Sequence, residues 1–361
     1  MNYWSKEKAW KWYQELPWLC GFNYIPRTAV NWTEMWQKET FDLATIEQEI
    51  AWAKAIGFNT VRTNIPFIVW QHDRDGLWQR LNRFLNVIEK NGFFAMICLL
   101  EDCEFSGEGP YLGPQKPPIP NVHNSRASSS PGRNIVMQKD KWPQVGAYVK
   151  DALSTFGEDK RIFVWDLYNE PGNGMIFDTK DQERDFHPTF ENYSYELMVN
   201  AFQWAREIAT IQPLTVAGWH VPLHWIEDDR NLHNHSIDLK AFELSDIITF
   251  HAYCPNECLR RIIHKLNRYD RPMLCTEWMA RQAESRILEQ LPVFKKENIG
   301  CYQWGLVKGK TQTHIPWPSI VSHLSDQPDL LDEWFHDLLY PDGTPYSVDE
   351  INLIKKLTNP T

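Results

Sequence analysis

The stretch Trp165-Asp-Leu-Tyr-Asn-Glu-Pro171 ends a predicted β-strand at a carboxylate. Residues 162–168 are rich in β-branched and aromatic side chains, which suit a buried strand. Pro171 has no N–H for a sheet ladder, and it favours an extended conformation at Glu170. The strand therefore runs up to Glu170 and presents this side chain at its carboxyl end, where parallel α/β folds bind their ligands.

A second carboxylate has the same kind of position. Glu277 lies near the end of the apolar run Pro272-Met-Leu-Cys-Thr-Glu-Trp-Met. Because parallel strands end at the same edge of a sheet, we expect Glu170 and Glu277 to approach each other despite their separation along the chain.

Further strand-like runs precede, separate and follow these two. The predicted strands are 18–24, 59–65, 93–100, 162–170, 214–220, 245–253, 273–277 and 299–306. The predicted helices are 4–16, 45–56, 81–89, 142–155, 192–211, 259–267, 286–295, 329–339 and one that begins at Ser347. This alternation predicts an α/β chain with a (β/α)8 TIM-barrel fold, a single domain over residues 1–361. The rival is an open doubly wound sheet, but no Gly-x-Gly-x-x-Gly or Walker sequence supports nucleotide binding there.

Three segments lie outside the repeating pattern. Residues 1–16 contain the N-terminal helix, and residues 345–361 contain the C-terminal helix. Residues 101–135, between the third strand and the next helix, form a loop rich in proline and glycine. A loop of this length is uncommon unless it is functional, so we expect a wall or lid of the site. The alternative is a floppy insertion.

Composition narrows the classes of function. The 361 residues carry a formal net charge of −10, which argues against nucleic acid as a partner. The sequence has no signal-peptide run and no membrane-length apolar stretch, so it predicts a cytoplasmic protein, although a trimmed secreted form has the same appearance. Its seven cysteines are scattered and suit a reduced compartment. We expect no cofactor, and the oligomeric state is left open.

Two carboxylates at one mouth suit the cleavage of a glycosidic bond. One protonates the leaving oxygen, and the other attacks the anomeric carbon or activates water. We expect Arg62 to keep Glu277 ionised as the nucleophile and Glu170 to have a raised pKa as the acid. A separation of about 5–5.5 Å between the carboxyl groups would indicate a retaining mechanism.

The tripeptide Asn169-Glu170-Pro171 resembles the acid/base motif of clan A retaining glycoside hydrolases, particularly family five and its cellulase-like relatives. Other positions also match the family in strand order, namely Arg62, His251, Tyr253, Glu277 and Trp304. The resemblance implies that Asn169 binds the sugar 2-hydroxyl, that His251 and Tyr253 steady the glutamates, and that Trp304 floors the cleavage subsite. It implies a retaining β-glycosidase acting on plant-type oligo- or polysaccharides such as β-glucosides, β-xylosides, β-galactosides or β-mannosides.

Nearly the whole chain is similar to a bacterial group often labelled 1,4-β-xylanase. The matching segments include Gly21–Ala29 and the run that begins at Trp304. One departure lies in the long loop, where relatives carry Gly-Trp-Val-Gln and this chain has Arg126-Ala-Ser-Ser. The tryptophan of that motif is therefore missing here, which alters the expected geometry of the sugar-binding subsite.

Several residues have competing interpretations. His220 is either a substrate contact or a structural histidine. Side chains alternate faces along a strand, so Asn169 and Glu170 reach one sugar only if the strand end twists or bulges. Trp317 would line the site, with Lys308, Lys310 and Gln312, only if the loop after the eighth strand folds inward.

Two other classes of function remain. A zinc-dependent hydrolase on the same barrel would draw its ligands from His220, His224, His233, His235, Cys254 and Cys258. A non-catalytic sugar-binding barrel would keep the aromatic residues without turnover.

Overall fold

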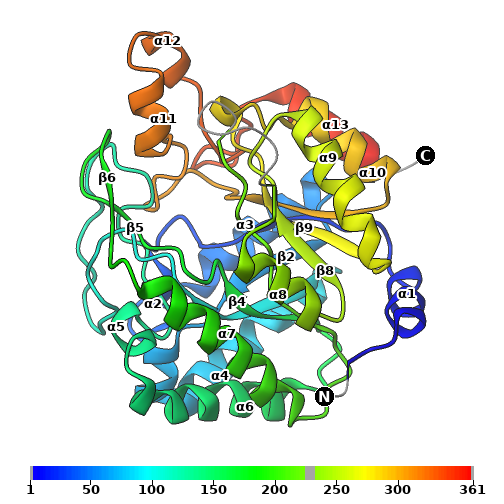
Figure 1. Ribbon diagram of the computed structural model, residues 1–361. Helices are drawn as coiled ribbons and strands as arrows, with labels where there is room; N and C mark the ends of the chain where they lie inside the picture. The colour runs from blue at the N-terminus through cyan, green and yellow to red at the C-terminus, as the bar shows by residue number, and fades with distance from the viewer. Residues whose placement is uncertain (1–2, 224–231, 359–361) are drawn as a thin grey trace.

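The computed structural model describes residues 3–223 and 232–358 of the chain (Figure 1). Eight parallel strands form one sheet in the order β7-β4-β3-β2-β1-β10-β9-β8. Their bounds are β1 Cys20–Asn23, β2 Thr60–Asn64, β3 Phe94–Glu101, β4 Ile162–Asn169, β7 Leu214–Thr215, β8 Ile248–His251, β9 Met273–Trp278 and β10 Gly300–Trp304. The eight predicted strands are all present, each shorter than or close to its predicted range.

Hydrogen bonds beyond the short strand β7 close the sheet into a barrel. The Gly218 amide donates to the Thr249 carbonyl at 3.0 Å, and the His251 amide donates to the Gly218 carbonyl at 2.8 Å. The predicted (β/α)8 barrel is therefore confirmed.

Helices cover the outside of the barrel (Figure 1). They are α1 Lys6–Gln14, α2 Trp32–Trp36, α3 Leu43–Ile56, α4 Phe67–Lys90, α5 Arg133–Val136, α6 Trp142–Phe156, α7 Phe190–Arg206, α8 Ser236–Leu244, α9 Asn256–Leu266, α10 Ile287–Lys296, α11 Pro318–His323, α12 Pro328–Leu331 and α13 Val348–Thr358. Helix α3 ends at Gly57, whose φ of 108° suits glycine. The Gly57 N–H donates to the carbonyls of Ala53 and Lys54, which lie in the last turn of the helix and need a partner there. None of the helices in the described segments has the length and apolar character needed to cross a membrane.

The predicted helix over 329–339 is wrong beyond its first residues. Helix α12 ends at Leu331, and the chain then runs inward, with Phe335, Leu338 and Leu339 buried. These apolar residues contribute to the core from an irregular segment, so their burial does not require a helix.

Helix α1 covers the amino-terminal end of the barrel. Trp12 stacks on Phe163 at 6.0 Å between ring centroids, and the Tyr13 hydroxyl donates to the Asn298 carbonyl at 2.8 Å. The opposite, carboxyl-terminal end carries the long loop 101–135, α11 and a hairpin of β5 Met175–Phe177 and β6 Glu183–Asp185 (Figure 1).

A buried arginine fixes the long loop to this hairpin. The Arg133 guanidinium donates to the carbonyl of Asp102 at 3.0 Å, and to those of Asn173 and Met175 at 2.9 and 2.8 Å. Because these carbonyls belong to two segments, the start of the loop and the start of the hairpin, the arginine holds the two segments together.

Candidate active site

A cavity of about 600 Å³ opens at the carboxyl end of the barrel and contains both predicted carboxylates. Loops that follow β1, β3, β4, β7, β8 and β10 contribute side chains to its walls. The long loop supplies Cys103, Phe105, His123, Asn124 and Ala127. The long loop therefore lines the cavity, and Ala127 lies within the Arg126-Ala-Ser-Ser departure.

Glu170 reaches the cavity through a change of backbone conformation. Its φ is 43°, in the left-handed region that non-glycine residues seldom adopt. This turn re-aims the side chain, so that Glu170 Oε1 lies 2.9 Å from His251 Nδ1 while the Asn169 amide nitrogen donates to Glu101 at 2.9 Å. The expected twist at the strand end is what allows Asn169 and Glu170 to line one cavity.

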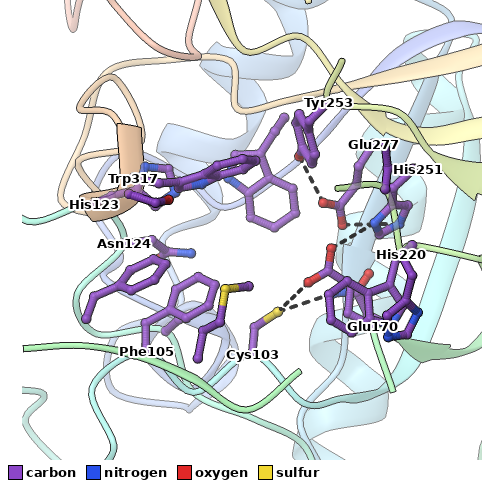
Figure 2. A pocket seen from close by; sticks show the side chains of 18 of the residues that line it. Cys103, Phe105, His123, Asn124, Glu170, His220, His251, Tyr253, Glu277 and Trp317 are labelled. Carbon is purple, nitrogen blue, oxygen red and sulfur yellow. Dashed lines mark hydrogen bonds and ion pairs between the residues drawn. The ribbon is translucent and has the colours of Figure 1, made fainter. Parts of the chain in front are cut away.

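An irregular register places Glu277. Phe250 pairs with Cys275, but His251 pairs with Glu277, so β9 carries one extra residue at Thr276. A bulge of this kind bends a strand and redirects a side chain. Glu277 Oε2 accepts a hydrogen bond of 2.9 Å from Tyr253 (Figure 2). Its Oε1 accepts one of 3.0 Å from Arg62.

The two carboxylates lie close together. One oxygen of Glu170, one oxygen of Glu277 and one nitrogen of His251 all lie within 4.8 Å of one another. Within residues 3–223 and 232–358, this is the group whose donor atoms converge enough to hold a metal ion. A cation there would be repelled by the Arg62 guanidinium, which already pairs with Glu277.

Arg62 is fully enclosed and forms the base of the site. Its guanidinium donates to Asp166 at 2.8 and 2.9 Å and to Asn23 at 2.7 Å, besides Glu277 and Asn169. Asp166 thereby neutralises the arginine and fixes its direction. Sequence reasoning missed Asp166, although it stands in the quoted strand.

The pKa directions of the pair differ from the sequence-based prediction. Burial would raise the pKa of Glu170, but hydrogen bonds from His251, Cys103 and Asn173 and the charge of His251 outweigh it and lower the pKa. Burial raises the pKa of Glu277, and the charge of Glu170 adds to this, despite the opposing charges of His251 and Arg62 and the hydrogen bond from Tyr253. The prediction that the pKa of Glu170 is raised is therefore wrong.

The remaining predicted residues also reach the cavity. His220 lines it from the segment after β7, with Nδ1 2.6 Å from Asp238 Oδ1, and its ring stacks on His235 at 3.8 Å. Trp304 lines it from the end of β10 and is half-buried. The structure thus gathers all eight predicted site residues in or directly beneath one cavity.

Two residues that the sequence did not single out bind Glu170. The Cys103 thiol donates to Glu170 Oε2 at 3.1 Å (Figure 2). The Asn173 side-chain amide donates to the same oxygen at 2.7 Å. Trp317 lines the cavity, so the loop after β10 does fold inward, but Lys308, Lys310 and Gln312 are not among the lining residues. Their side chains point elsewhere, for example Lys310 to Glu34 at 3.1 Å.

The zinc alternative receives no support from the described residues. His220 and His233 both direct Nδ1 to Asp238. The cysteines Cys254 and Cys258 are buried. His224 lies outside the described residues. Among those that are described, the proposed His/Cys set does not converge on one point.

Comparisons with known proteins agree with the geometry at the level of the fold. No protein-family model matches the sequence, and neither does any curated protein. Among solved structures, an exo-β-1,4-mannosidase from Opitutaceae bacterium strain TAV5 is similar, with a TM-score of 0.59 and 15% identity over 95% of this chain and 60% of that one. A GH5_18 protein from Streptomyces cattleya has a TM-score of 0.56 and 14% identity over 95% and 81%.

An endo-1,4-β-D-mannanase from Thermotoga petrophila RKU-1 has a TM-score of 0.55 and 11% identity, over 94% of this chain and 99% of that chain. The chain therefore has the barrel fold of these glycoside hydrolases, as the resemblance predicted. It spans less than two thirds of the mannosidase.

Proposed function

We propose that this protein is a retaining β-glycosidase in which Glu170 is the acid/base and Glu277 the nucleophile. The observation that carries the proposal is the convergence of the two carboxylates, with oxygens within 4.8 Å, in a cavity large enough for sugar rings. Carboxyl groups of retaining enzymes lie about 5–5.5 Å apart, whereas inverting enzymes leave room for water at about 6.5–9.5 Å. The glycoside hydrolases that share the fold support the same class of reaction.

The contacts of each carboxylate support its role. Arg62 and Tyr253 both donate to Glu277, which stabilises the ionised form that attacks the anomeric carbon. Glu170 then protonates the leaving oxygen. Once Glu277 is glycosylated its charge is gone, and the ionised Glu170 activates the water that releases the sugar.

The pKa directions add one condition to this mechanism. The hydrogen bond and charge of His251 lower the pKa of Glu170, whereas burial and the charge of Glu170 raise the pKa of Glu277. The productive arrangement has the proton on Glu170. Sugar binding that breaks the hydrogen bond between His251 and Glu170 would restore that arrangement.

Two substitutions test the assignment. Glu277→Ala should abolish turnover of aryl β-glycosides while the fold is kept, as judged by circular dichroism. Glu170→Ala should slow substrates with poor leaving groups by about 10²–10⁴-fold, the usual contribution of a general acid. Azide should partly restore the rate with an activated leaving group and yield a β-glycosyl azide. An unchanged rate in Glu277→Ala, or an inverted product, would refute the proposal.

A further inference from the structure

The cavity continues from the carboxylates to a second wall, which we call the distal wall. It consists of Phe105, His123, Asn124, Phe177 and Trp317. Figure 2 shows Phe105, Asn124 and Trp317 across the open space from Glu170 and Glu277. Phe105 stacks on Phe177 at 4.2 Å, and Trp317 packs edge-on to Tyr253 at 5.0 Å. The distal wall is therefore rigid and continuous with the side of the cavity that holds the nucleophile.

Asn124 is the unsatisfied polar group of this wall. The residue is 4% exposed, and its side-chain oxygen Oδ1 has no hydrogen-bond partner. Its backbone is fixed, because the Asn124 amide donates to the Thr311 carbonyl at 2.8 Å. Figure 2 shows the side chain directed into the cavity. Because Oδ1 is enclosed, the polar atom that a ligand in the cavity can reach is the amide nitrogen at the end of the side chain, which can donate a hydrogen bond to a sugar hydroxyl group.

The charges of the cavity select against anionic ligands. Among the described residues that line it, the carboxylates are Glu101, Glu170, Glu183 and Glu277, and no lysine or arginine is present. Burial lowers the pKa of His123 to about 4 and that of His336 further, so both rings are neutral near pH 7. Arg62, below the cavity, is already paired with Asp166 and Glu277. A uronate or phosphate group would meet these carboxylates and find no lysine or arginine partner among the lining residues.

We propose that the distal wall binds a second, uncharged sugar ring, and that Asn124 selects this ring through a hydrogen bond to one of its hydroxyl groups. The inference rests on the proposed glycosidase function and narrows its substrates to short neutral oligosaccharides. Aromatic faces pack on the apolar faces of sugar rings, and the distal wall supplies them. The volume of about 600 Å³ lies within the usual range of small-molecule pockets, about 300–1,000 Å³.

Steady-state kinetics on paired substrates test the proposal. The probes are named by their number of sugar rings. The one-ring probes are p-nitrophenyl β-glucoside, β-mannoside and β-glucuronide, and the two-ring probes are cellobiose and β-1,4-mannobiose. Asn124→Ala should lower kcat/KM for the favoured disaccharide by about three- to ten-fold, the effect of one neutral hydrogen bond. The kcat/KM of the same variant for the p-nitrophenyl glycoside of the same sugar should change less than about two-fold. Asn192→Asp, an exposed change on α7, is the matched control and should alter neither.

Three results would overturn the proposal. They are an equal loss on one-ring and two-ring probes, no loss on either, and glucuronide turnover as fast as that of the neutral glycosides. If Asn124→Ala does not fold, Asn124→Asp serves, and the added charge should weaken the disaccharide further.

Calorimetric binding of the two disaccharides to Glu277→Gln separates this inference from the proposed function. Binding that depends on Asn124 without turnover by the wild type would retain the subsite and refute the glycosidase. Turnover by the wild type, together with binding that does not depend on Asn124, would support the glycosidase and refute the subsite. Binding of neither disaccharide would also refute the subsite.

Discussion

His251 and Glu170 are joined by a hydrogen bond of 2.9 Å between Nδ1 and Oε1. The other ring nitrogen of His251, Nε2, lies 3.6 Å from Glu277 Oε1. One imidazole therefore contacts both carboxylates of the proposed pair, from the strand that lies beside β9. Its charge and its hydrogen bond lower the pKa of Glu170, and its charge opposes the rise in the pKa of Glu277.

Replacing His251 by alanine should move the whole pH profile of kcat/KM to higher pH. Both carboxyl groups lose a contribution that lowers their pKa, so both apparent pKa values of the pair should rise. The measurement is the pH dependence of aryl glycoside hydrolysis by the variant, over a pH range wide enough to fit both limbs of the profile. A shift to lower pH would contradict the described contact.

Tyr253→Phe should move only one limb of the pH profile of kcat/KM. The hydroxyl donates to Glu277 at 2.9 Å and has no such contact with Glu170. Its loss destabilises the ionised form of Glu277, so one apparent pKa should rise while the other stays nearly constant. Equal displacement of both limbs would mean that Tyr253 acts on the pair as a whole.

If the proposed activity is correct, Cys103 should be the thiol through which small reagents abolish it. It is the half-buried cysteine of the seven, and the other six are buried. Methyl methanethiosulfonate at Cys103 would place a methylthio group against Glu170 Oε2, which lies 3.1 Å from the sulfur. We expect one modification by mass spectrometry, with loss of activity.

Cys103→Ser is the control for that experiment. It should remain active after treatment, and a bound inhibitory sugar should protect the wild type. Because burial raises the pKa of the Cys103 thiol, the reaction should be slow at neutral pH. Inactivation of Cys103→Ser at the wild-type rate would show that another group is modified.

The sequence predicted the barrel because its strands are continuous apolar runs that end at polar residues. It predicted Glu170 and Glu277 because each stands at such an end. Strand bounds were less accurate at β7, where hydrogen bonds to β8 continue beyond the two residues with regular strand geometry. The hairpin of β5 and β6 was missed, since three-residue strands carry no periodic pattern.

The relative acidities in the site could not be predicted from the sequence. They depend on which carboxylate His251 faces, and that follows from the bulge in β9 and the positive φ of Glu170. Asp166 was missed for a similar reason. One acidic residue in a buried strand does not reveal that it pairs with Arg62, 104 positions away.

Two histidines with lowered pKa values should make the fold sensitive to acid. Burial lowers the pKa of His123 to about 4 and that of His314 to about 3, both below the ordinary value of 6.5. The unfolded chain binds these protons first, so stability is complete above about pH 6.5 and declines as the pH falls towards 4. His123 alone should account for about 2 kcal/mol between pH 8 and pH 5.

Urea unfolding at pH 8, 6.5 and 5 measures this effect. His123→Gln retains an amide donor for the Ile315 carbonyl, which lies 2.7 Å from His123 Nδ1, and removes the titrating group. The variant should lose less stability on acidification than the wild type. His187→Gln, on the exposed segment before α7, should lose as much as the wild type. Identical pH dependence in all three proteins would exclude His123 as the source.

Arg281 and Glu350 form a buried ion pair whose loss should cost substantial stability. The guanidinium donates to Glu350 at 3.0 and 2.6 Å, and also to the carbonyls of Trp334, His336 and Asp337. Glu350→Ala leaves this buried cation without a counterion, which typically costs about 3–5 kcal/mol. Lys6→Ala removes an exposed pair with Asp270 and should cost less than about 1 kcal/mol. Since Arg281 holds the segment that carries His336 to the cavity, Glu350→Ala should also weaken disaccharide binding without moving the pH profile. A displaced profile would indicate that the change reaches the carboxylate pair itself.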